Sequence, residues 1–434
     1  MKKAVKIGVI GARRGETMID YCRKVGNAQL VAICEKREDL VQEQKVKNVG
    51  LDIAYYEDYD EFLNHDMDAV VLANYANEHA PFAIKALNKG LHVFSEVLPC
   101  QTMKEAVELI ETVEKTGLVY AYGENYCYFS APYEMGRLYK EGKIGDLEYA
   151  ECEYLHNCES IWPGIAYGDK THWRNNMYST FYCTHSIGPI IHATGLRPVS
   201  VTGFEPPKMN ERNLRCGIKG GGFGIEMITL NNGAIVKSIH GGTYENSIWY
   251  TMYGSKGRME TARESAKNDG YHRIYVKADE NSGDYKSKEE TYLPAENNAN
   301  PLAKTFGHGG SDFYSMFNFI EKINGSKDAD VIDVYEAMDM FLPGMFAYRS
   351  ILSGGIPMQI PNLRDKNERE KWRNDVKCTS ESVAGKDLLP CFHGGNPEIS
   401  DEVYDNQRKM FEDDVRKKKT ALTFKAGVDE YKDK

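Results

Sequence analysis

Two proton-transfer side chains stand three residues apart near the middle of this chain: the phenol of Tyr182 and the imidazole of His185. They lie in the run Phe-Tyr-Cys-Thr-His-Ser-Ile-Gly-Pro, residues 181–189, downstream of a glycine-rich turn typical of nucleotide binding. Oxidation of a hydroxyl to a ketone removes a proton from oxygen and a hydride from carbon, so it needs a base beside a hydride acceptor. The pattern predicts a site for that chemistry. A core histidine bonded to a carbonyl is the alternative for His185.

The first 125 residues alternate short apolar runs with amphipathic segments, the pattern of a parallel sheet with helices on both faces. We expect strands at residues 5–10, 29–34, 69–73, 92–95 and 119–122. Beyond residue 126 we expect a helix at 132–141 and strands at 147–155, 199–204, 222–230, 234–241 and 247–254.

The predicted fold class is therefore α/β. An N-terminal Rossmann domain is expected over residues 1–126, followed by a C-terminal α+β domain with a largely antiparallel open sheet over 127–362. Residues 363–434 form a highly charged extension, which we expect either to wrap the surface or to contact another subunit.

Residues 8–15, where the first predicted strand turns into a helix, carry three glycines, with Arg13 where the second glycine of Gly-x-Gly-x-x-Gly would stand. Glu35 closes the second strand. In a dinucleotide fold the glycines let the backbone approach the pyrophosphate, and the acidic side chain accepts the ribose hydroxyls. Glu35 thus favours NAD over NADP, whereas Lys36 and Arg37 could instead meet a 2′-phosphate. The residues expected to line the cofactor are Gly8, Gly11, Arg13, Gly15, Glu35, Asn74, His79 and Glu96.

Composition excludes several classes of partner. A net charge of −10 and a pI near 5.7 argue against nucleic acid or an anionic membrane as the main partner, because both require a basic surface. We expect no transmembrane span and no cleaved leader. Ten cysteines without paired spacing suggest neither a disulfide framework nor structural zinc, so a cytoplasmic protein with reduced thiols is expected. We also expect a homo-oligomer.

Four motifs, one of them the run already described, follow the glycine turn in this order: Gly-Glu-Asn-Tyr-Cys-Tyr at 123–128, Glu-Tyr-Leu-His at 153–156, Tyr-x-Thr-His-x-x-Gly-Pro at 182–189 and Gly-His-Gly-Gly-Ser-Asp at 307–312. In these motifs and in the order of its elements, over about residues 1–360, the chain resembles the Gfo/Idh/MocA family of sugar oxidoreductases. The motifs are similar to those of one branch, the NAD-dependent glycosidases of the α-N-acetylgalactosaminidase type. They are also similar to gut-bacterial enzymes that oxidise the 3-hydroxyl of glycosides.

The chain departs from the family at two positions of the expected site. The usual Glu-Lys-Pro is Glu-Val-Leu-Pro at 96–99, and the usual Asp-x-x-x-His has Phe181 in place of the aspartate. The proton-transfer lysine is thus missing, so either catalysis is lost or another group serves as the base. The catalytic candidates are His185 as the base, Tyr182 as its partner, and Tyr154 and Glu124 for positioning the sugar or moving a second proton.

The resemblance implies an NAD(H)-dependent oxidoreductase that converts a ring hydroxyl of a glycoside, at C3, to a ketone. The new carbonyl acidifies the C2 proton, and loss of that proton can expel the C1 substituent. A complete NAD-dependent glycosidase of the α-N-acetylgalactosaminidase type is therefore the alternative. A non-catalytic NAD-bound sensor is a third hypothesis, because the lysine and the aspartate are missing.

Sugar-binding candidates lie on two segments. Trp173, Arg174 and Asn175 offer a flat apolar face, a fork of donors and an amide, which suit a sugar ring, although they could equally anchor a loop. His308 and Asp312 could line the site or cap the following helix. The tyrosines belong to a chain with 28 of them and could merely pack. The histidines between residues 156 and 240 lack metal-ligand spacing, so no metal is expected.

Overall fold

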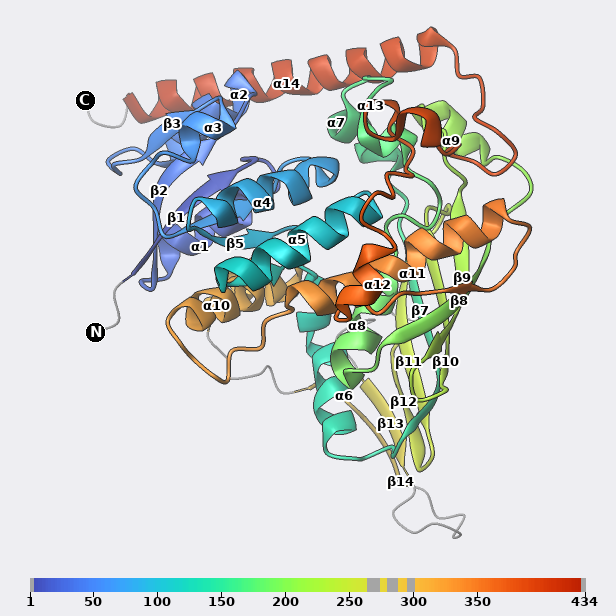
Figure 1. Ribbon diagram of the computed structural model, residues 1–434. Helices are drawn as coiled ribbons and strands as arrows, with labels where there is room; N and C mark the ends of the chain where they lie inside the picture. The colour runs from blue at the N-terminus through green and yellow to red at the C-terminus, as the bar shows by residue number, and fades with distance from the viewer. Residues whose placement is uncertain (1–3, 264–273, 279–287, 295–300, 431–434) are drawn as a thin grey trace.

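The computed structural model describes residues 4–263, 274–278, 288–294 and 301–430, with side chains described as far as residue 417. Two β-sheets organise these residues (Figure 1). The first sheet is parallel and has the strand order β3-β2-β1-β4-β5-β6. Its strands are β1 (Val5–Ile10), β2 (Ala28–Cys34), β3 (Ala54–Tyr56), β4 (Ala69–Leu72), β5 (His92–Ser95) and β6 (Tyr120–Tyr122). The predicted Rossmann sheet is confirmed, with the half-buried β3 as an addition.

Alternate residues of the central strands face two different cores. Ile7 and Val9 of β1 pack with α1 and α10, whereas Val70 and Leu72 of β4 pack with α3, α4 and α5. The helices are α1 (Glu16–Lys24), α2 (Glu38–Lys47), α3 (Tyr59–Phe62), α4 (His79–Asn88), α5 (Met103–Thr116) and α10 (Ser311–Ile323). Because α10 lies within the span 127–362 that was expected to form the second domain, part of that span packs on the first sheet.

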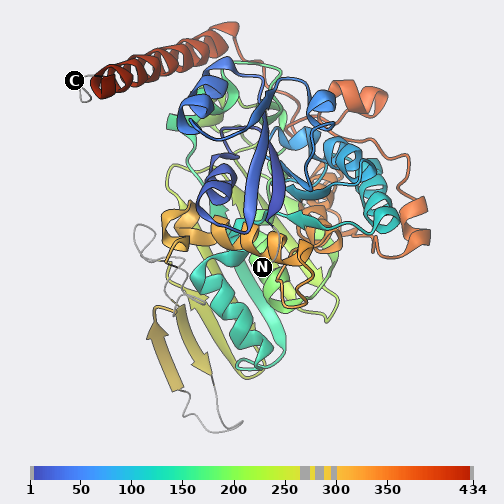
Figure 2. The same ribbon diagram turned by 90° about the vertical axis from the view of Figure 1, so that its left-hand side faces the viewer.

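The second sheet has nine strands in the order β14-β13-β12-β11-β7-β10-β9-β8-β15. Neighbouring strands run antiparallel except β7 and β10, which run parallel. The strands are β7 (Leu147–Leu155), β8 (Pro198–Phe204), β9 (Phe223–Leu230), β10 (Ile235–Gly241), β11 (Ser247–Gly254), β12 (Gly257–Thr261), β13 (Ile274–Ala278), β14 (Lys288–Tyr292) and β15 (Met358–Gln359). The expected largely antiparallel sheet is confirmed, and its outer strands extend away from the Rossmann domain (Figure 2).

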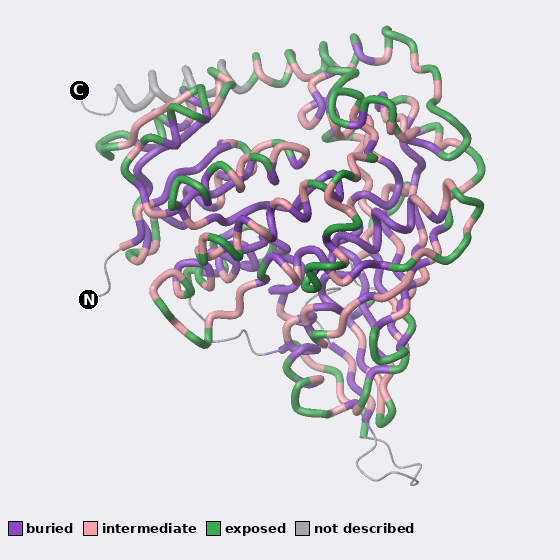
Figure 3. The backbone as a smooth tube through the Cα atoms, viewed as in Figure 1, coloured by how far each residue is buried: buried purple, intermediate pink, exposed green. Residues whose placement is uncertain are grey.

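Three helices pack against this sheet: α6 (Ser130–Lys140) on β12 and β13, α8 (Thr184–Thr194) on β7, β10 and β11, and α11 (Val334–Leu352) on β8, β9 and β15. α11 also contacts α5 and β6, so one helical layer serves both sheets. The most deeply buried backbone runs through this layer and both sheets (Figure 3). As a result, the start of α8 lies where the two domains meet.

The charged extension folds back along the chain. Its helices are α12 (Lys366–Glu370), α13 (Glu381–Ala384) and α14 (Asp401–Glu430). Arg369 and Arg373 form ion pairs with Glu114 and Glu111 of α5, each at 2.6–2.7 Å. α14 then crosses from the second domain towards α2 and β3 of the first (Figure 1). The segment thus lies along the surface of the chain, and a contact of this segment with another subunit stays a prediction. None of the helices in the described ranges is long and apolar enough to cross a membrane.

A partly buried ion group holds α8 in place. His192 Nδ1 lies 2.7 Å from Glu336 Oε1, and its Nε2 lies 3.3 Å from Asp330 Oδ2. Burial by itself would lower the pKa of His192, but the two carboxylates outweigh it and raise the pKa to about 10. The imidazole is therefore a cation at neutral pH, shared between α8 and the start of α11.

We expect His192→Gln to lower the free energy of unfolding by about 2 kcal/mol, because two partly buried carboxylates lose the cation that they share. The pKa of His192 is raised above the usual 6.5 in the folded protein. The stabilisation by its positive charge is therefore complete below pH 6.5 and is lost as the pH rises through about 10. Denaturant unfolding of parent and variant across this range measures it. Lys85→Gln, which removes an exposed ion pair with Asp60, is the matched control. Equal losses in the two variants would contradict the assignment.

Candidate active site

The expected cofactor residues gather along one edge of the Rossmann sheet, at the carboxyl ends of its strands. Gly11 follows β1, Glu35 follows β2, Asn74 follows β4, and Glu96 follows β5. Glu124 follows β6 at the same edge. Ligands of open parallel sheets bind outside these strand ends.

The turn between β1 and α1 is shaped for a close ligand. Gly11 has φ +87°, and a Cβ there would lie 2.4 Å from the carbonyl oxygen of Ala73. The first turn of α1 has no side-chain cap, so its N–H groups are free to meet an anion such as a pyrophosphate. Gly8 does not belong to this turn. It lies within β1, and a Cβ there would meet the ring of Phe62 at 2.6 Å, so packing explains that glycine.

The carboxylate of Glu35 organises the ribose end of the turn. Its Oε2 accepts the Ala12 N–H at 2.8 Å, and its Oε1 accepts the Arg37 N–H at 2.9 Å. The guanidinium of Arg37 is bonded to Asp39, with Nε 3.1 Å from Oδ1 and Nη2 2.6 Å from Oδ2. Because Arg37 is committed to Asp39, a 2′-phosphate would meet the negative charge of Glu35 first.

Two further expected residues lie beside this edge. Asn74 donates to Glu78 Oε2 at 2.9 Å, and its own Oδ1 is buried without a partner. His79 contacts the Leu98 carbonyl through Nδ1 at 2.8 Å, and burial lowers its pKa to about 4, which keeps it neutral. Arg13 is exposed at the turn, with its guanidinium beside Gly164 of α7 (Pro163–Ala166). The glycine turn, the uncapped helix and these polar groups fit a dinucleotide.

A charged network occupies the middle of the edge. Arg14 Nη2 lies 2.7 Å from Glu96 Oε1 and 3.1 Å from Asp312 Oδ1. Asn125 also donates to Asp312 Oδ1 at 3.1 Å, and His308 Nδ1 lies 2.9 Å from Asp312 Oδ2. Burial acts to raise the pKa of Asp312, but Arg14 and His308 hold it well below its usual range. Arg14 was not among the residues predicted for the site. Its position in the glycine turn was the one sequence feature that could have indicated it.

Two residues of the expected site belong to this network. Burial raises the pKa of Glu96, although its pairing with Arg14 acts in the opposite direction. His308, which we expect on the sugar, bonds Asp312 through Nδ1, and its contact with the sugar stays a prediction. Asp312 itself binds Arg14 and Asn125, and α10, which begins at Ser311 after the N-cap residue Gly310, has no side-chain cap.

Glu124 and His185 form a buried pair across the two domains. His185 Nδ1 lies 2.7 Å from Glu124 Oε1, while Glu124 Oε2 accepts the Thr184 hydroxyl at 2.6 Å. Glu124 is 0% exposed and His185 is 8% exposed. The carboxylate orients the imidazole through Nδ1 and leaves Nε2 to take part in proton transfer. His185 thus has a hydrogen bond to Glu124 and a ring contact with Tyr182. The role of Tyr182 as its partner in proton transfer stays a prediction.

Aromatic rings surround this imidazole. The ring centroids of Tyr126, Tyr154 and Tyr182 lie 4.6, 4.7 and 5.1 Å from that of His185. Burial raises the pKa of Tyr154 well above its ordinary value and also raises that of Tyr182. Both phenols are therefore neutral donors at pH 7. Tyr126, which the sequence analysis did not single out, completes the enclosure.

A cavity of about 100 Å³ opens between Tyr154, Tyr182 and the second sheet. Arg174 lines it and donates from Nη2 to the Tyr182 hydroxyl at 3.5 Å. His240 also lines it. Its Nε2 accepts the Tyr182 N–H at 3.1 Å, and burial lowers its pKa to about 3, so its proton stays on the unpartnered Nδ1. The cavity therefore offers buried donors to hydroxyl or carbonyl oxygens.

Asn175 and Trp173, the other two members of the expected sugar-binding segment, contact residues of their own loop region. Asn175 is 1% exposed, accepts from Trp162 Nε1 at 2.9 Å and donates to the Asp169 carbonyl at 2.7 Å. Trp173 lies under the Arg174 guanidinium, 4.5 Å from the ring centroid. Arg174 alone of the three lines the cavity. No cluster of His, Cys, Asp or Glu suited to a metal ion occurs among the described residues.

Two family models match different parts of the chain. Residues 5–124 match the Gfo/Idh/MocA oxidoreductase family, NAD-binding Rossmann fold, and residues 208–373 match the C-terminal domain of glycosyl hydrolase 109. The chain thus combines an NAD-binding Rossmann domain of the Gfo/Idh/MocA oxidoreductase family with a second region that is similar to the C-terminal domain of glycosyl hydrolase 109.

Relatives and solved structures agree with this assignment. A glycosyl hydrolase family 109 protein of Solibacter usitatus is 26% identical over 85% of this chain and 89% of its own length. An α-N-acetylgalactosaminidase of Tannerella forsythia is 25% identical over 69% of this chain and 71% of its own. The structure of scyllo-inositol dehydrogenase from Lactobacillus casei with NAD(H) and scyllo-inositol has a TM-score of 0.63 at 18% identity, covering 84% of this chain and 100% of that one. This last likeness establishes the fold.

We expect the protein to bind NAD at least about tenfold more tightly than NADP, because a 2′-phosphate would face the Glu35 carboxylate. Glu35→Gln should reduce this difference in affinity. The variant should bind NAD more weakly, and it should no longer repel the 2′-phosphate of NADP. Calorimetric titration of both nucleotides measures it, with the exposed Glu57→Gln as the control. Tighter binding of NADP by the parent protein would mean that Lys36 and Arg37 dominate the pocket.

Proposed function

We propose that this protein is an NAD-dependent glycosidase that cleaves its substrate through transient oxidation of C3. The observation that carries the proposal is the buried pair of Glu124 and His185, ringed by tyrosines at the nucleotide edge of the Rossmann sheet. The match of residues 208–373 to the glycosyl hydrolase 109 domain supports cleavage over simple oxidation. The role of each residue below is part of the proposal.

His185 takes the proton of the C3 hydroxyl. Glu124 holds its Nδ1–H, so Nε2 carries the lone pair that a base requires, and the buried carboxylate stabilises the imidazolium that forms. Bound NAD supplies the chemistry of hydride removal from C3 and of its later return. Val97, which stands where the family has lysine, is buried and has no titratable group. Phe181 is likewise packed among aromatic rings.

A second proton must leave C2 once C3 is a ketone. Loss of this proton expels the C1 substituent, water then adds at C1, a proton returns to C2, and the hydride returns to C3. The sum is hydrolysis without net oxidation. Tyr154 is our candidate for the C2 step because it lies against His185 from β7 and lines the cavity.

Arg174 and Tyr182 hold the sugar. Their contact at 3.5 Å presents guanidinium and phenol groups together at the cavity wall, where hydroxyl oxygens can accept from both. Two of the relatives are named α-N-acetylgalactosaminidases, so an α-N-acetylgalactosaminide is the first substrate to test. A homo-oligomer stays a prediction.

Replacement of His185 by alanine should lower turnover by about 10²–10⁴-fold with little change in NAD affinity, since the base is lost and the nucleotide edge is intact. Steady-state kinetics and NAD titration on one preparation measure the two quantities. His65→Ala, in a histidine that bonds Tyr56 within the Rossmann domain, is the control. Near-parent turnover in His185→Ala would show that another group is the base.

Substrate turned over in deuterated water should yield free sugar that carries deuterium at C2, without accumulation of NADH. Mass spectrometry and NMR of the sugar, with absorbance at the NADH band, measure this. Because burial keeps the Tyr154 phenol protonated, its phenolate grows about tenfold per pH unit below its pKa, so C2 exchange should quicken as the pH rises.

The matched variant is Tyr154→Phe, which should abolish C2 exchange while hydride transfer from C3 persists. Tyr149→Phe, on the same strand but outside the cavity, is the control. A product two hydrogens lighter that keeps its C1 substituent would instead identify a dehydrogenase that releases the keto-glycoside. No turnover and no exchange on any glycoside would favour an NAD-bound sensor.

A further inference from the structure

α14 lies outside both segments that match family models, yet it reaches the nucleotide edge. Its first turns are anchored to the second domain. The Tyr404 hydroxyl donates to the Gly217 carbonyl, and Arg408 donates to the Gly168 carbonyl, each at 3.1 Å. From there the helix runs on towards the start of α2 in the Rossmann domain (Figure 1).

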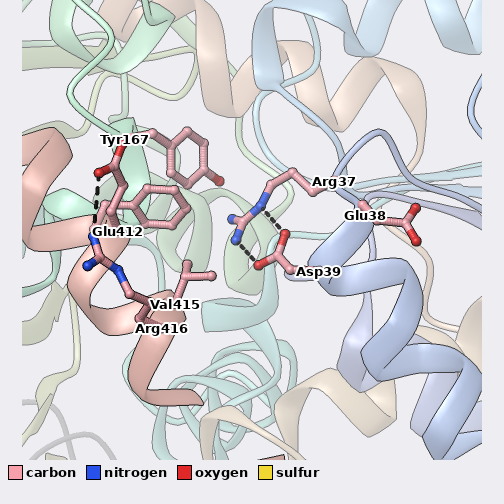
Figure 4. Close-up of a pocket in the computed structure, with 8 residues that line it drawn as sticks. Arg37, Glu38, Asp39, Tyr167, Glu412, Val415 and Arg416 are labelled. Atoms are coloured by element: carbon pink, nitrogen blue, oxygen red, sulfur yellow. Dashed lines mark hydrogen bonds and ion pairs between the residues drawn. The ribbon is translucent and has the colours of Figure 1, made fainter. Parts of the chain in front are cut away.

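A pocket of about 640 Å³ lies between the start of α2 and α14. Arg37 and Tyr167 line it from the main body, and Phe411 and Val415 line it from α14. Figure 4 shows Arg37 extended towards Tyr167 and α14, while Glu38 turns away. A neighbouring pocket of about 220 Å³ shares Arg37, Phe411 and Val415 and continues to Ala12 in the glycine turn.

The start of α1 and the Glu35 carboxylate indicate how a dinucleotide would lie along this edge. The pyrophosphate belongs at the uncapped start of α1, and the adenosine ribose belongs at Glu35. The adenine must then lie beyond Glu35, on the side of Arg37. We propose that the pocket between α2 and α14 is the adenine site of NAD, and that α14 forms its outer wall through Phe411 and Val415.

The chemistry of the walls suits a flat, neutral base. The Arg37 guanidinium lies 5.0 Å from the ring centroid of Tyr167 and 4.8 Å from that of Phe411. Asp39 fixes this guanidinium from the side through two hydrogen bonds. The two aromatic rings are 4.9 Å apart. Adenine stacks on such cationic and aromatic faces, and these contacts are sensitive to the loss of one ring.

The inference rests on the NAD-binding domain and does not depend on the glycosidase reaction. Because α14 is anchored on the second domain, adenine bound under it is held by both domains. Nucleotide release then requires this helix to move, or the base to slip past Phe411.

The test is titration of Phe411→Ala with NAD, ADP-ribose and nicotinamide mononucleotide. We expect the affinity for NAD and for ADP-ribose to fall about tenfold or more, because one stacking wall is lost. Binding of nicotinamide mononucleotide, which has no adenine, should not change. Phe411→Tyr should retain parent affinity, and Met410→Ala, at the adjacent 55% exposed position, is the control.

Unchanged ADP-ribose affinity in Phe411→Ala would overturn the proposal, as would an equal loss for all three ligands. Thermal unfolding without nucleotide checks that the variant is folded. If Phe411→Ala does not fold, Val415→Glu places a charge in the same wall from the next turn of α14. This variant should bind NAD and ADP-ribose more weakly and bind nicotinamide mononucleotide with unchanged affinity. Affinities for NAD and ADP-ribose equal to those of the parent protein would also overturn the proposal.

Discussion

The buried carboxylate of Glu124 is the constraint on which the site depends. A fully buried anion is tolerated only where hydrogen bonds replace its lost hydration. Glu124 obtains them from the Tyr126 N–H beside it and from the Thr184 hydroxyl and His185 imidazole of the other domain. The end of β6 and the start of α8 are thus drawn to one point. The same bonds that join the domains leave His185 Nε2 available beside the nucleotide edge.

Other contacts hold the two domains in the arrangement that Glu124 requires. α10 packs on the Rossmann sheet, and its Asp312 meets Arg14 of the glycine turn. The cation of His192 fixes the far end of α8 to α11. The extension then returns to α5 through Arg369 and Arg373, and α14 continues over the adenosine side. A nucleotide on this edge would touch segments from the beginning, middle and end of the chain.

Much of the fold was predictable because its signals are local. β1, β5, β7 and β11 have the predicted bounds, since each is a continuous or alternating apolar run between clear turns. β3 consists of three half-buried residues, which do not form an apolar run long enough to predict a strand. β12 to β15 are short, and their pairing depends on partners distant in the chain. Among the glycines, the pattern alone could not separate Gly11, required by its positive φ, from Gly8, required by packing.

The sequence by itself determined the fold class, the NAD-binding edge and the identity of most side chains in the candidate site, because periodicity and short motifs are carried by neighbouring residues. Only the tertiary structure decided which of those side chains meet. Glu124 and His185 are 61 residues apart, Arg14 and Asp312 are 298 apart, and Arg37 is covered by Phe411 of the extension. The physical reason is that a buried charge takes its partners from whatever packing brings within hydrogen-bond reach, and packing joins segments without regard to their separation along the chain.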